Sequence, residues 1–473
     1  MPQRALCIHG HFYQPPREDP LTGEIPIEPG AAPYRNWNER IHAQCYYPNA
    51  LLRNFNRISF NMGPTLMEWM FDFDPETEAN IIQQERDNLE THGVGNAMAQ
   101  AYNHTILPLA KYHDKVTQVR WGISDFELRF GHFPSGMWLP ETAADDETLE
   151  VLADCGIQYT ILAPWQATLS PIDTRKPYRV PLSKGREIIV FFYNQELSTR
   201  VSFDPASTVN ADRFLNEFVL PEFRQEGEPD GYDELVLIAS DGELYGHHQP
   251  FRDKFLAYLT DGALKNRAID LTYPGLWLKN HPVTETVSIR QGTSWSCLHG
   301  VLRWSGVCNC TPHSEWKAPF RQALDKLADA IDEEYLKLVN GRMQDPWELR
   351  HRYIRVIHAE LDLEDLIKEL TGHSVSEKDI MRIHTMLRAQ YERQRMFTSC
   401  GWFFDDFDRI EPRNNVAYAA QAVLLTKQAT GADLSLLAED ALSRVSSWRT
   451  GLRADEVFRN HLKRAAETWN RLP

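Results

Sequence analysis

The sequence predicts an α/β domain followed by an all-helical domain. Over roughly the first 310 residues, short apolar and β-branched runs alternate with helical patterns, as strands and helices alternate around a parallel sheet. From Trp316 on, apolar residues recur every three or four positions, which indicates amphipathic helices. We therefore expect a barrel or a doubly wound sheet over residues 1–310 and a helical domain over residues 311–473.

Six runs in the first part have the composition of buried strands. They are Ala5–His11, Ile58–Met62, Ser135–Leu139, Gln158–Ala163, Ile188–Tyr193 and Leu235–Ser240. A helix is predicted between the third and fourth of these runs, because acidic residues fill its first turns and Gly156 stands where a C-cap is expected. A strand, a helix and a strand in this order form a βαβ unit.

The helical part has clear start and stop signals. Asp345-Pro346 is typical of an N-cap followed by a proline in the first turn, and a helix should run from there to about Leu370. Further helices are expected from Ser376, from Val416 to a stop at Gly431, and twice more beyond. The first helix of this part should bury one face, made of Phe320, Leu324, Leu327, Ile331, Tyr335 and Leu338.

Composition excludes several classes of partner. The 473-residue chain has a net charge of −16, so we expect it to bind neither nucleic acid nor an anionic membrane surface. No apolar run approaches the ~20 residues needed to cross a bilayer. The seven cysteines and the absence of a signal-like N-terminus favour a reducing, cytoplasmic location. The sequence leaves the oligomeric state open.

One long irregular segment, Arg17–Asn36, follows the first strand and contains repeated proline and glycine. Loops after strands build the active-site face of a barrel, so this segment is predicted to line a cleft. A passive surface insertion is the alternative.

Two carboxylates are the candidate catalytic pair. Glu141 in GMWLPETA and Asp241 in LVLIASDGELYGHH each follow a predicted strand, where side chains point into the mouth of a parallel barrel. Glycoside cleavage needs such a pair, one residue as acid and the other as nucleophile or base. For each carboxylate alone, a helix N-cap is the plainer interpretation. Nearby aromatic and imidazole groups favour a sugar site, although a core of this size needs aromatics anyway: Trp138, Tyr245, His247, His248 and Trp295.

His9 and His11 share one face of the first strand. Such a pair can bind a divalent metal, as in some deacetylases and mannosidases. No aspartate completes a ligand set nearby, so we expect substrate hydrogen bonding, with no metal or other cofactor in the catalytic site.

Three cysteines and a histidine lie within fourteen residues: Cys297, His299, Cys308 and Cys310. Free thiols, a structural zinc site and a disulfide are all compatible with this spacing, in that order of expectation.

At these motifs the chain resembles the glycoside hydrolase family 57 α-glucan enzymes, which include α-amylases, 4-α-glucanotransferases and branching enzymes. His11 with Gln14-Pro15 is similar to the first family motif, and residues 99–104, which end in His104, occupy the place of the second but depart from its commoner pattern. Residues 138–141 and 241–247 resemble the third and fourth motifs. The segments around Trp295 and Trp402 resemble the fifth motif and an aromatic segment of the helical domain.

This resemblance implies an incomplete (β/α)7 barrel at residues 1–310 with a helical domain at 311–473 that contributes to the cleft. It implies a retaining hydrolase or transglycosylase acting on α-glucans, with Glu141 as nucleophile and Asp241 as acid/base. The residues expected to bind substrate are His11, Gln14, His104, Trp138, His247, Trp295 and Trp402. Two alternatives remain open at this point, a metal-dependent hydrolase of the deacetylase or mannosidase kind and a non-catalytic glycan-binding protein.

Overall fold

The computed structural model describes residues 3–224 and 232–469. Packing divides the chain into two compact units. The α/β unit comprises residues 1–14, 27–100 and 126–295, and the helical unit comprises residues 15–26, 101–125 and 296–473. The sequence predicts one continuous stretch for each domain, with a division at residue 310. In the structure, two segments from the first half of the chain pack instead with the helices.

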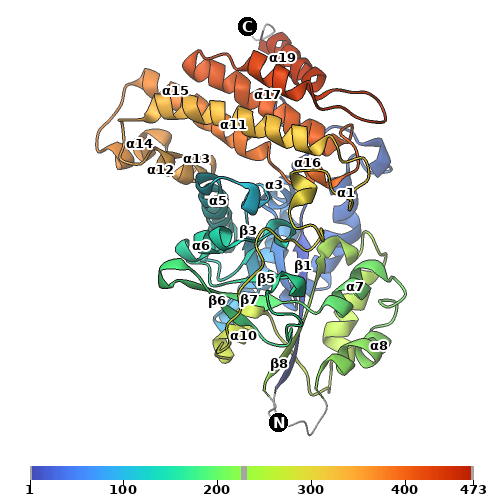
Figure 1. Cartoon of the computed structure of the whole chain (residues 1–473). Helices are drawn as coiled ribbons and strands as arrows, with labels where there is room; N and C mark the ends of the chain where they lie inside the picture. The colour runs from blue at the N-terminus through green and yellow to red at the C-terminus, as the bar shows by residue number, and fades with distance from the viewer. Residues whose placement is uncertain (1–2, 225–231, 470–473) are drawn as a thin grey trace. The chain divides into compact units, whose positions relative to one another are not determined.

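The α/β unit contains two sheets (Figure 1). In the larger, the strand order is β4-β3-β2-β1-β8, with β9 also paired to β1; in the smaller it is β5-β7-β6. Every pair is parallel except β6 with β7. The strands are β1 Arg4–Phe12, β2 Ser59–Met62, β3 Ala97–Gln100, β4 Met137–Trp138, β5 Tyr159–Leu162, β6 Tyr178–Pro181, β7 Glu187–Phe192, β8 Glu234–Asp241 and β9 Asp270–Leu271.

This arrangement confirms the predicted incomplete barrel. The parallel strands, β1 to β5 with β7, β8 and β9, follow one another along the chain with helices between most of them. All six predicted strands are present. β1 and its neighbour β8 are both buried along nearly their whole length, as expected for parallel strands covered on both faces.

Apart from α4, the helices of the α/β unit are short, and most begin with a proline or a side-chain cap. They are α1 Trp37–Ile41, α2 Tyr47–Leu51, α3 Pro64–Phe73, α4 Pro75–His92, α6 Asp146–Asp154, α7 Gln195–Phe203, α8 Ala211–Phe214, α9 Arg252–Tyr258 and α10 Pro274–Asn280. α6 is the helix predicted between strands. Asp145 caps it by accepting from the Thr148 N–H, and Gly156 beyond its end has the left-handed φ of 87°.

The helical unit packs α11, α15 and α17 alongside one another, with α19 against α17 (Figure 1). Its helices are α11 Lys317–Val339, α12 Pro346–Arg352, α13 Ile354–Ile357, α14 Leu363–Thr371, α15 Glu377–Arg395, α16 Cys400–Phe403, α17 Ile410–Thr430, α18 Ser435–Leu442 and α19 Ala454–Trp469, joined by most of α5 Tyr112–Phe130. All six residues of the predicted α11 face are buried.

The helix caps predicted for this unit are present in the structure, but one predicted helix is not. Asp345 caps α12, Ser376 caps α15, and Gly431 ends α17 with a φ of 86°. The single helix expected from Pro346 to about Leu370 is wrong, because the chain breaks into α12, α13 and α14. Ala359, with a φ of 55°, interrupts it without a proline or glycine to signal the break.

The predicted loop Arg17–Asn36 is irregular apart from one short turn at Pro29–Ala31. Its first part packs within the helical unit, where Glu18 pairs with Arg395 and Asp19 pairs with Arg464. Its role in lining a cleft stays a prediction.

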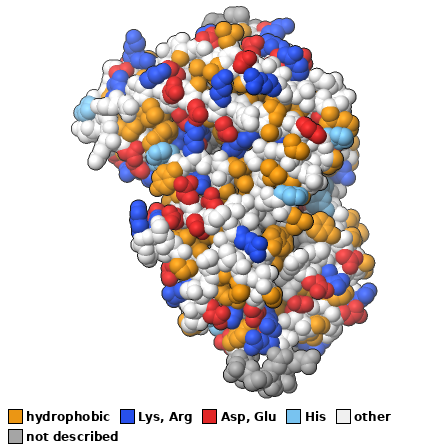
Figure 2. All heavy atoms as spheres, in the orientation of Figure 1, with side chains coloured by type: hydrophobic (Ala, Val, Ile, Leu, Met, Phe, Trp, Pro, Cys, Tyr) orange, Lys and Arg blue, Asp and Glu red, His pale blue; other side chains and the backbone are white. Residues whose placement is uncertain are grey.

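Acidic and basic side chains are interspersed over the visible surface (Figure 2). Within the part of the chain that the structure describes, no helix is long and apolar enough to cross a membrane.

Candidate active site

The site is built where parallel strands of the α/β unit end. His11 on β1 lies at the same level as Asn61 on β2 and Asp241 on β8. β4 ends at Trp138, three residues before Glu141. Because the carboxyl ends of these strands meet at one edge of the sheet, both predicted carboxylates fall at that edge.

Glu141 is held in an unusual backbone conformation. Its φ of 58° and ψ of 20° are left-handed, and Thr142 follows with a φ of 48°. Two such non-glycine residues in succession are costly and persist only where the surroundings enforce them. Gln166 does so for Thr142, accepting from its hydroxyl and donating to its carbonyl, both at 2.8 Å.

Trp295 fixes Glu141 from the other side. The backbone N–H of Trp295 donates to the Glu141 carbonyl at 3.0 Å, and its indole Nε1 donates to the Oε2 of the Glu141 carboxylate at 3.1 Å. The predicted substrate-binding tryptophan therefore has a more direct role, since it aims the candidate nucleophile. Its ring is half-buried.

Asp241 is the last residue of β8 and is accessible to solvent. Desolvation, together with the negative charges of Glu243 and Glu141, raises the pKa of the Asp241 carboxyl to about 8. Protein atoms crowd the Asp241 carboxyl, although the residue remains open to solvent. Because the negative charge of Glu141 contributes to the raised pKa of Asp241, the two predicted carboxylates are near enough to influence each other.

Glu243 is the other acidic residue in the motif. The strand stops at Asp241 and a 3-10 turn, Gly242–Leu244, follows, so Glu243 is not carried on the strand face. Its Oε1 accepts hydrogen bonds from the Tyr46 hydroxyl at 2.7 Å and the Tyr13 N–H at 3.1 Å. Burial raises the pKa of Glu243 to about 7 against these hydrogen bonds, which lower it. Glu243 is thus engaged inside the protein, while Asp241 faces solvent.

Glycines let this motif turn tightly beside β1. A side chain at Gly242 would meet the Phe12 ring at 2.4 Å. Gly246 has a φ of 145°, and a side chain there would lie 2.2 Å from the Gln44 carbonyl oxygen.

The two histidines of β1 are buried and neutral. His9 has both ring nitrogens in hydrogen bonds, to Ser59 at 2.9 Å and Asn61 at 3.2 Å. His11 also contacts Asn61, whose amide donates to Gln100 at 2.8 Å. Burial, and for His9 also the neighbouring His11, lowers the pKa of these imidazoles to about 3 and 4 against the opposing effect of Asn61.

These contacts bear on the metal-dependent alternative. Among residues 3–224 and 232–469, no group of three or more possible ligands includes His9 or His11. Both ring nitrogens of His9 are already committed to Ser59 and Asn61. In the part of the chain that the structure describes, His9 is thus engaged by protein partners at both ring nitrogens.

Trp138 forms the floor under the histidines. It is fully buried and stacks on His9 and His11, with ring centroids 4.6 and 5.3 Å apart, and Trp295 meets it edge-on at 5.1 Å. The Trp138 ring thus packs against the imidazoles of His9 and His11, and its contact with substrate stays a prediction.

Two further predicted binding residues border Asp241 and Glu243. Gln14 is buried, and its amide donates to the Tyr46 hydroxyl at 3.2 Å. His247 is half-buried and bonds Gln44 at 2.7 Å through Nδ1.

The last two predicted residues, His104 and Trp402, belong to the helical unit. His104 is buried with its Nδ1 2.7 Å from the Ser399 hydroxyl. Trp402 is 1% exposed and packs on Phe320 at 4.8 Å and on Phe397. In this structure the Trp402 ring is part of the core of the helical unit, and its contact with substrate stays a prediction.

Sequence reasoning missed Asn61 and Tyr46. Asn61 connects His9, His11 and Gln100, and Tyr46 orders Glu243 and Gln14. An asparagine inside the apolar run of β2 was the available signal, since a buried polar group in a strand needs a partner. Tyr46 lies in a π-helical turn, His42–Tyr46, that no simple periodicity predicts.

Comparison with known proteins identifies the family of this chain. The family model described as "Glycosyl hydrolase family 57" matches residues 33–290, and a "Domain of unknown function (DUF3536)" matches residues 313–472. Alpha-amylase 1 of Dictyoglomus thermophilum is 24% identical over 220 residues, which cover 44% of this chain and 29% of that protein. An alpha-amylase of Pyrococcus furiosus is 25% identical over 215 residues, which cover 44% and 30%. The chain thus spans less than a third of the length of these curated relatives.

Solved structures share the fold along nearly the whole chain. An exo-type maltose-forming amylase from Pyrococcus sp. ST04 superposes with a TM-score of 0.76 at 15% identity, over 97% of this chain and 88% of the other. A branching enzyme of Pyrococcus horikoshii gives 0.62 at 15% identity, over 96% of each chain. Because the family model spans more than half of the sequence and includes both strand-end carboxylates, this chain belongs to glycosyl hydrolase family 57.

Proposed function

We propose that the protein is a retaining enzyme that cleaves or transfers α-glucosidic bonds, with Glu141 as nucleophile and Asp241 as general acid/base. One observation carries the proposal: the carboxylates that follow β4 and β8 influence each other, and Asp241 is exposed to solvent with a pKa raised to about 8. A raised pKa keeps a proton on the acid, as the first step of glycoside cleavage requires.

The proposed chemistry follows from these positions. Asp241 protonates the leaving oxygen while Glu141 attacks the anomeric carbon, which forms a covalent glycosyl-enzyme. Asp241, now ionised, then removes a proton from water or from a sugar hydroxyl that displaces Glu141. Trp295 keeps the carboxylate of Glu141 oriented through its indole N–H. The neutral imidazole of His11, held by Asn61, is a hydrogen-bonding group for sugar hydroxyls.

The α-glucan substrate class rests on relatives. Family membership, curated relatives named as alpha-amylases, and similar structures titled as an amylase, a 4-alpha-glucanotransferase and branching enzymes all support it. Hydrolysis and transfer use the same two carboxylates and differ in which acceptor reaches the glycosyl-enzyme.

The test is product analysis on maltooligosaccharides, amylose and glycogen. Shorter chains alone indicate hydrolysis, a ladder of longer and shorter chains indicates transfer, and new branch points indicate branching. Fresh products should keep the α configuration when followed by NMR, because a retaining mechanism inverts the anomeric carbon twice. Inverted products, or activity that survives Glu141→Gln, would refute the assigned mechanism. Absence of activity on all of these α-glucans would show that the proposed substrate class is wrong.

A further inference from the structure

A second cluster of reactive side chains lies in the helical unit, in the segment before α11. Cys297, His299, Cys308 and Cys310, here called the Cys3His cluster, place one sulfur or nitrogen atom each within 4.8 Å of one another. The Cys297 sulfur lies 3.4 Å from that of Cys308 and 3.8 Å from that of Cys310. The His299 Nδ1 lies 3.3 and 3.4 Å from the sulfurs of Cys308 and Cys310.

These distances match the separations between ligand atoms around a tetrahedral zinc ion. A zinc ion bound at about 2.3 Å by sulfur and 2.0–2.1 Å by nitrogen separates its ligand atoms by about 3.5–3.8 Å. A disulfide would bring two sulfurs to about 2.05 Å, which none of these pairs approaches. Free thiols have no reason to gather three sulfurs and an imidazole nitrogen around one point. The third sulfur and the imidazole therefore favour a metal site over a disulfide or a set of free thiols.

The surroundings suit a bound metal thiolate. Backbone N–H groups of His299 and Arg303 donate toward the Cys297 sulfur, and that of Leu298 donates toward the Cys310 sulfur. Such N–H···S contacts are the outer-shell support that metal-bound thiolates use. The loop is also pinned, since the Cys308 N–H donates to the Ser314 hydroxyl at 3.0 Å.

Charge agrees as well. Zinc with three thiolates and a neutral imidazole carries one net negative charge. Arg303 lies beside the cluster, donating to the Cys310 carbonyl at 3.2 Å. The ammonium group of Lys317, at the start of α11, is fully buried and within electrostatic range of Cys297 and Cys308. An anionic site supplies the buried ammonium with the counter-charge that burial demands.

We propose that Cys297, His299, Cys308 and Cys310 bind one zinc ion that holds this loop in place. All four positions are filled by protein ligands, which is typical of structural rather than catalytic zinc. Cleavage by two carboxylates needs no metal, so this site is independent of the chemistry proposed above.

The test is metal analysis of the full chain purified under reducing conditions without chelator. We expect about one zinc per chain, and the zinc-stripped protein should take up Co²⁺ with the thiolate-to-cobalt charge-transfer and strong visible absorption of a tetrahedral site. Cys308→Ser and Cys310→Ser should lose the metal. Cys155→Ser and Cys400→Ser, which alter thiols outside the cluster, should keep it.

His299→Ala guards against variants that fail to fold, because His299 is exposed. It should weaken zinc affinity by at least the ~10–100-fold that loss of an outer-shell partner costs. The proposal is overturned if reduced wild-type protein binds neither Zn²⁺ nor Co²⁺, or if zinc persists at full stoichiometry in both cysteine variants. Isolation of a Cys297–Cys308 disulfide from the reduced, folded protein would overturn it too.

Discussion

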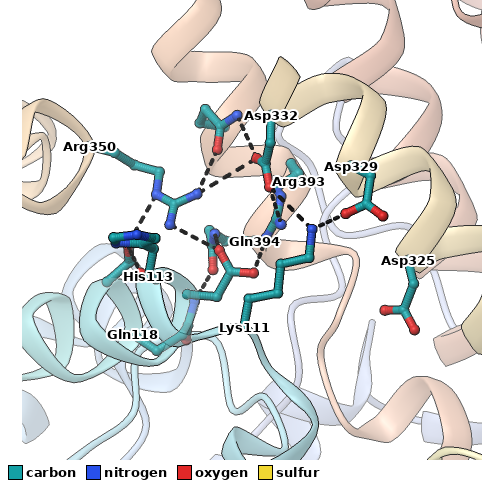
Figure 3. A network of polar contacts seen from close by, with 12 residues as sticks. Lys111, His113, Gln118, Asp325, Asp329, Asp332, Arg350, Arg393 and Gln394 are labelled. Carbon is teal, nitrogen blue, oxygen red and sulfur yellow. Dashed lines mark hydrogen bonds and ion pairs between the residues drawn. The ribbon is translucent and has the colours of Figure 1, made fainter. Parts of the chain in front are cut away.

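The strand-end carboxylates of the α/β unit differ sharply from the buried carboxylates of the helical unit. Asp332 on α11 lies beside Arg350 and Arg393 (Figure 3). Asp114 on α5 pairs with the same two arginines. Arg393 spans them, at 2.7 Å from each, and Arg350 reaches Asp114 at 2.9 Å. Burial raises the pKa of Asp114, but Arg393 and Arg350 overcome it and hold that pKa well below its usual range.

Amides complete this second arrangement. Gln390 joins Arg350 to Asp332 at 3.0 and 3.1 Å, and Gln394 donates to Asp114 at 2.9 Å. In the described part of the chain, Asp241 and Glu243 pair with no arginine or lysine. The same functional group is thus stabilised as an anion in one unit and as an acid in the other, and the difference is the presence of a cation. Buried carboxylates with cations hold structure, whereas those without are candidates for proton transfer.

The largest effect should come from removing the site carboxylates. Glu141→Gln and Asp241→Asn should each lower kcat by ~10²–10⁴, the range for losing a general acid or base, with the protein still folded. Asp146→Asn, which alters an exposed carboxylate at the start of α6, is the control and should keep full activity. Full activity in Asp241→Asn together with none in Glu243→Gln would transfer the acid role to Glu243.

The helical network should respond in stability instead. Asp114→Ala leaves two buried arginines short of a partner and should lower the free energy of unfolding by about 3–5 kcal/mol, measured by urea denaturation. Asp433→Ala breaks the exposed pair that Asp433 forms with Lys427 at 2.6 Å and should cost less than ~1 kcal/mol. Equal losses of unfolding free energy in the two variants would show that the buried network contributes no more stability than an exposed ion pair.

The pH dependence of activity should report Asp241. The acid step needs its proton, so kcat/KM should decline above the folded pKa of about 8, approaching tenfold per pH unit. Asp114→Asn should leave the position of this alkaline limb unchanged. If the limb instead begins near the ordinary carboxyl range, Asp241 is not held as an acid.

The last prediction concerns the direction in which two variants shift the melting temperature at alkaline pH. The folded pKa of Asp241 is raised, so its contribution to stability is present below its unfolded pKa of 3.8 and is lost as pH rises through about 8. Asp241→Asn should therefore raise the melting temperature at alkaline pH. Asp114 has a lowered pKa, so its contribution is present above the unfolded value, and Asp114→Asn should lower the melting temperature there. If the melting temperature shifted in the same direction in both variants, the proposed difference between the two carboxylates would be wrong.

Sequence reasoning predicted the parts that have strong local patterns. The apolar runs of β1 and β8, the caps Asp345 and Ser376 and the face of α11 all follow from residue type and spacing. β3, with the sequence AMAQ, and the two-residue β9 are too short to show a strand pattern in the sequence. Their extended conformation depends on pairing with neighbouring strands.

The site was predicted only as a set of residues at strand ends. Glu141 and Asp241 were found from their motifs, but the left-handed turn at Glu141 and the two hydrogen bonds from Trp295 depend on residues 154 positions apart. The network around Asp114 was invisible for the same reason: Asp114, Asp332 and Arg393 come from three distant helices.

The left-handed turn at Glu141 and Thr142 sets stability against function. Non-glycine residues in this region cost of order 1–3 kcal/mol each, and glycine would relieve most of that cost. A sequence optimised only for melting temperature would therefore replace both, and the Glu141 replacement would delete the nucleophile. Thr142→Gly would meanwhile remove the hydroxyl that Gln166 uses to hold the turn. Thermostability design on this chain has to leave these two positions alone, because the strain it would remove is what presents the carboxylate.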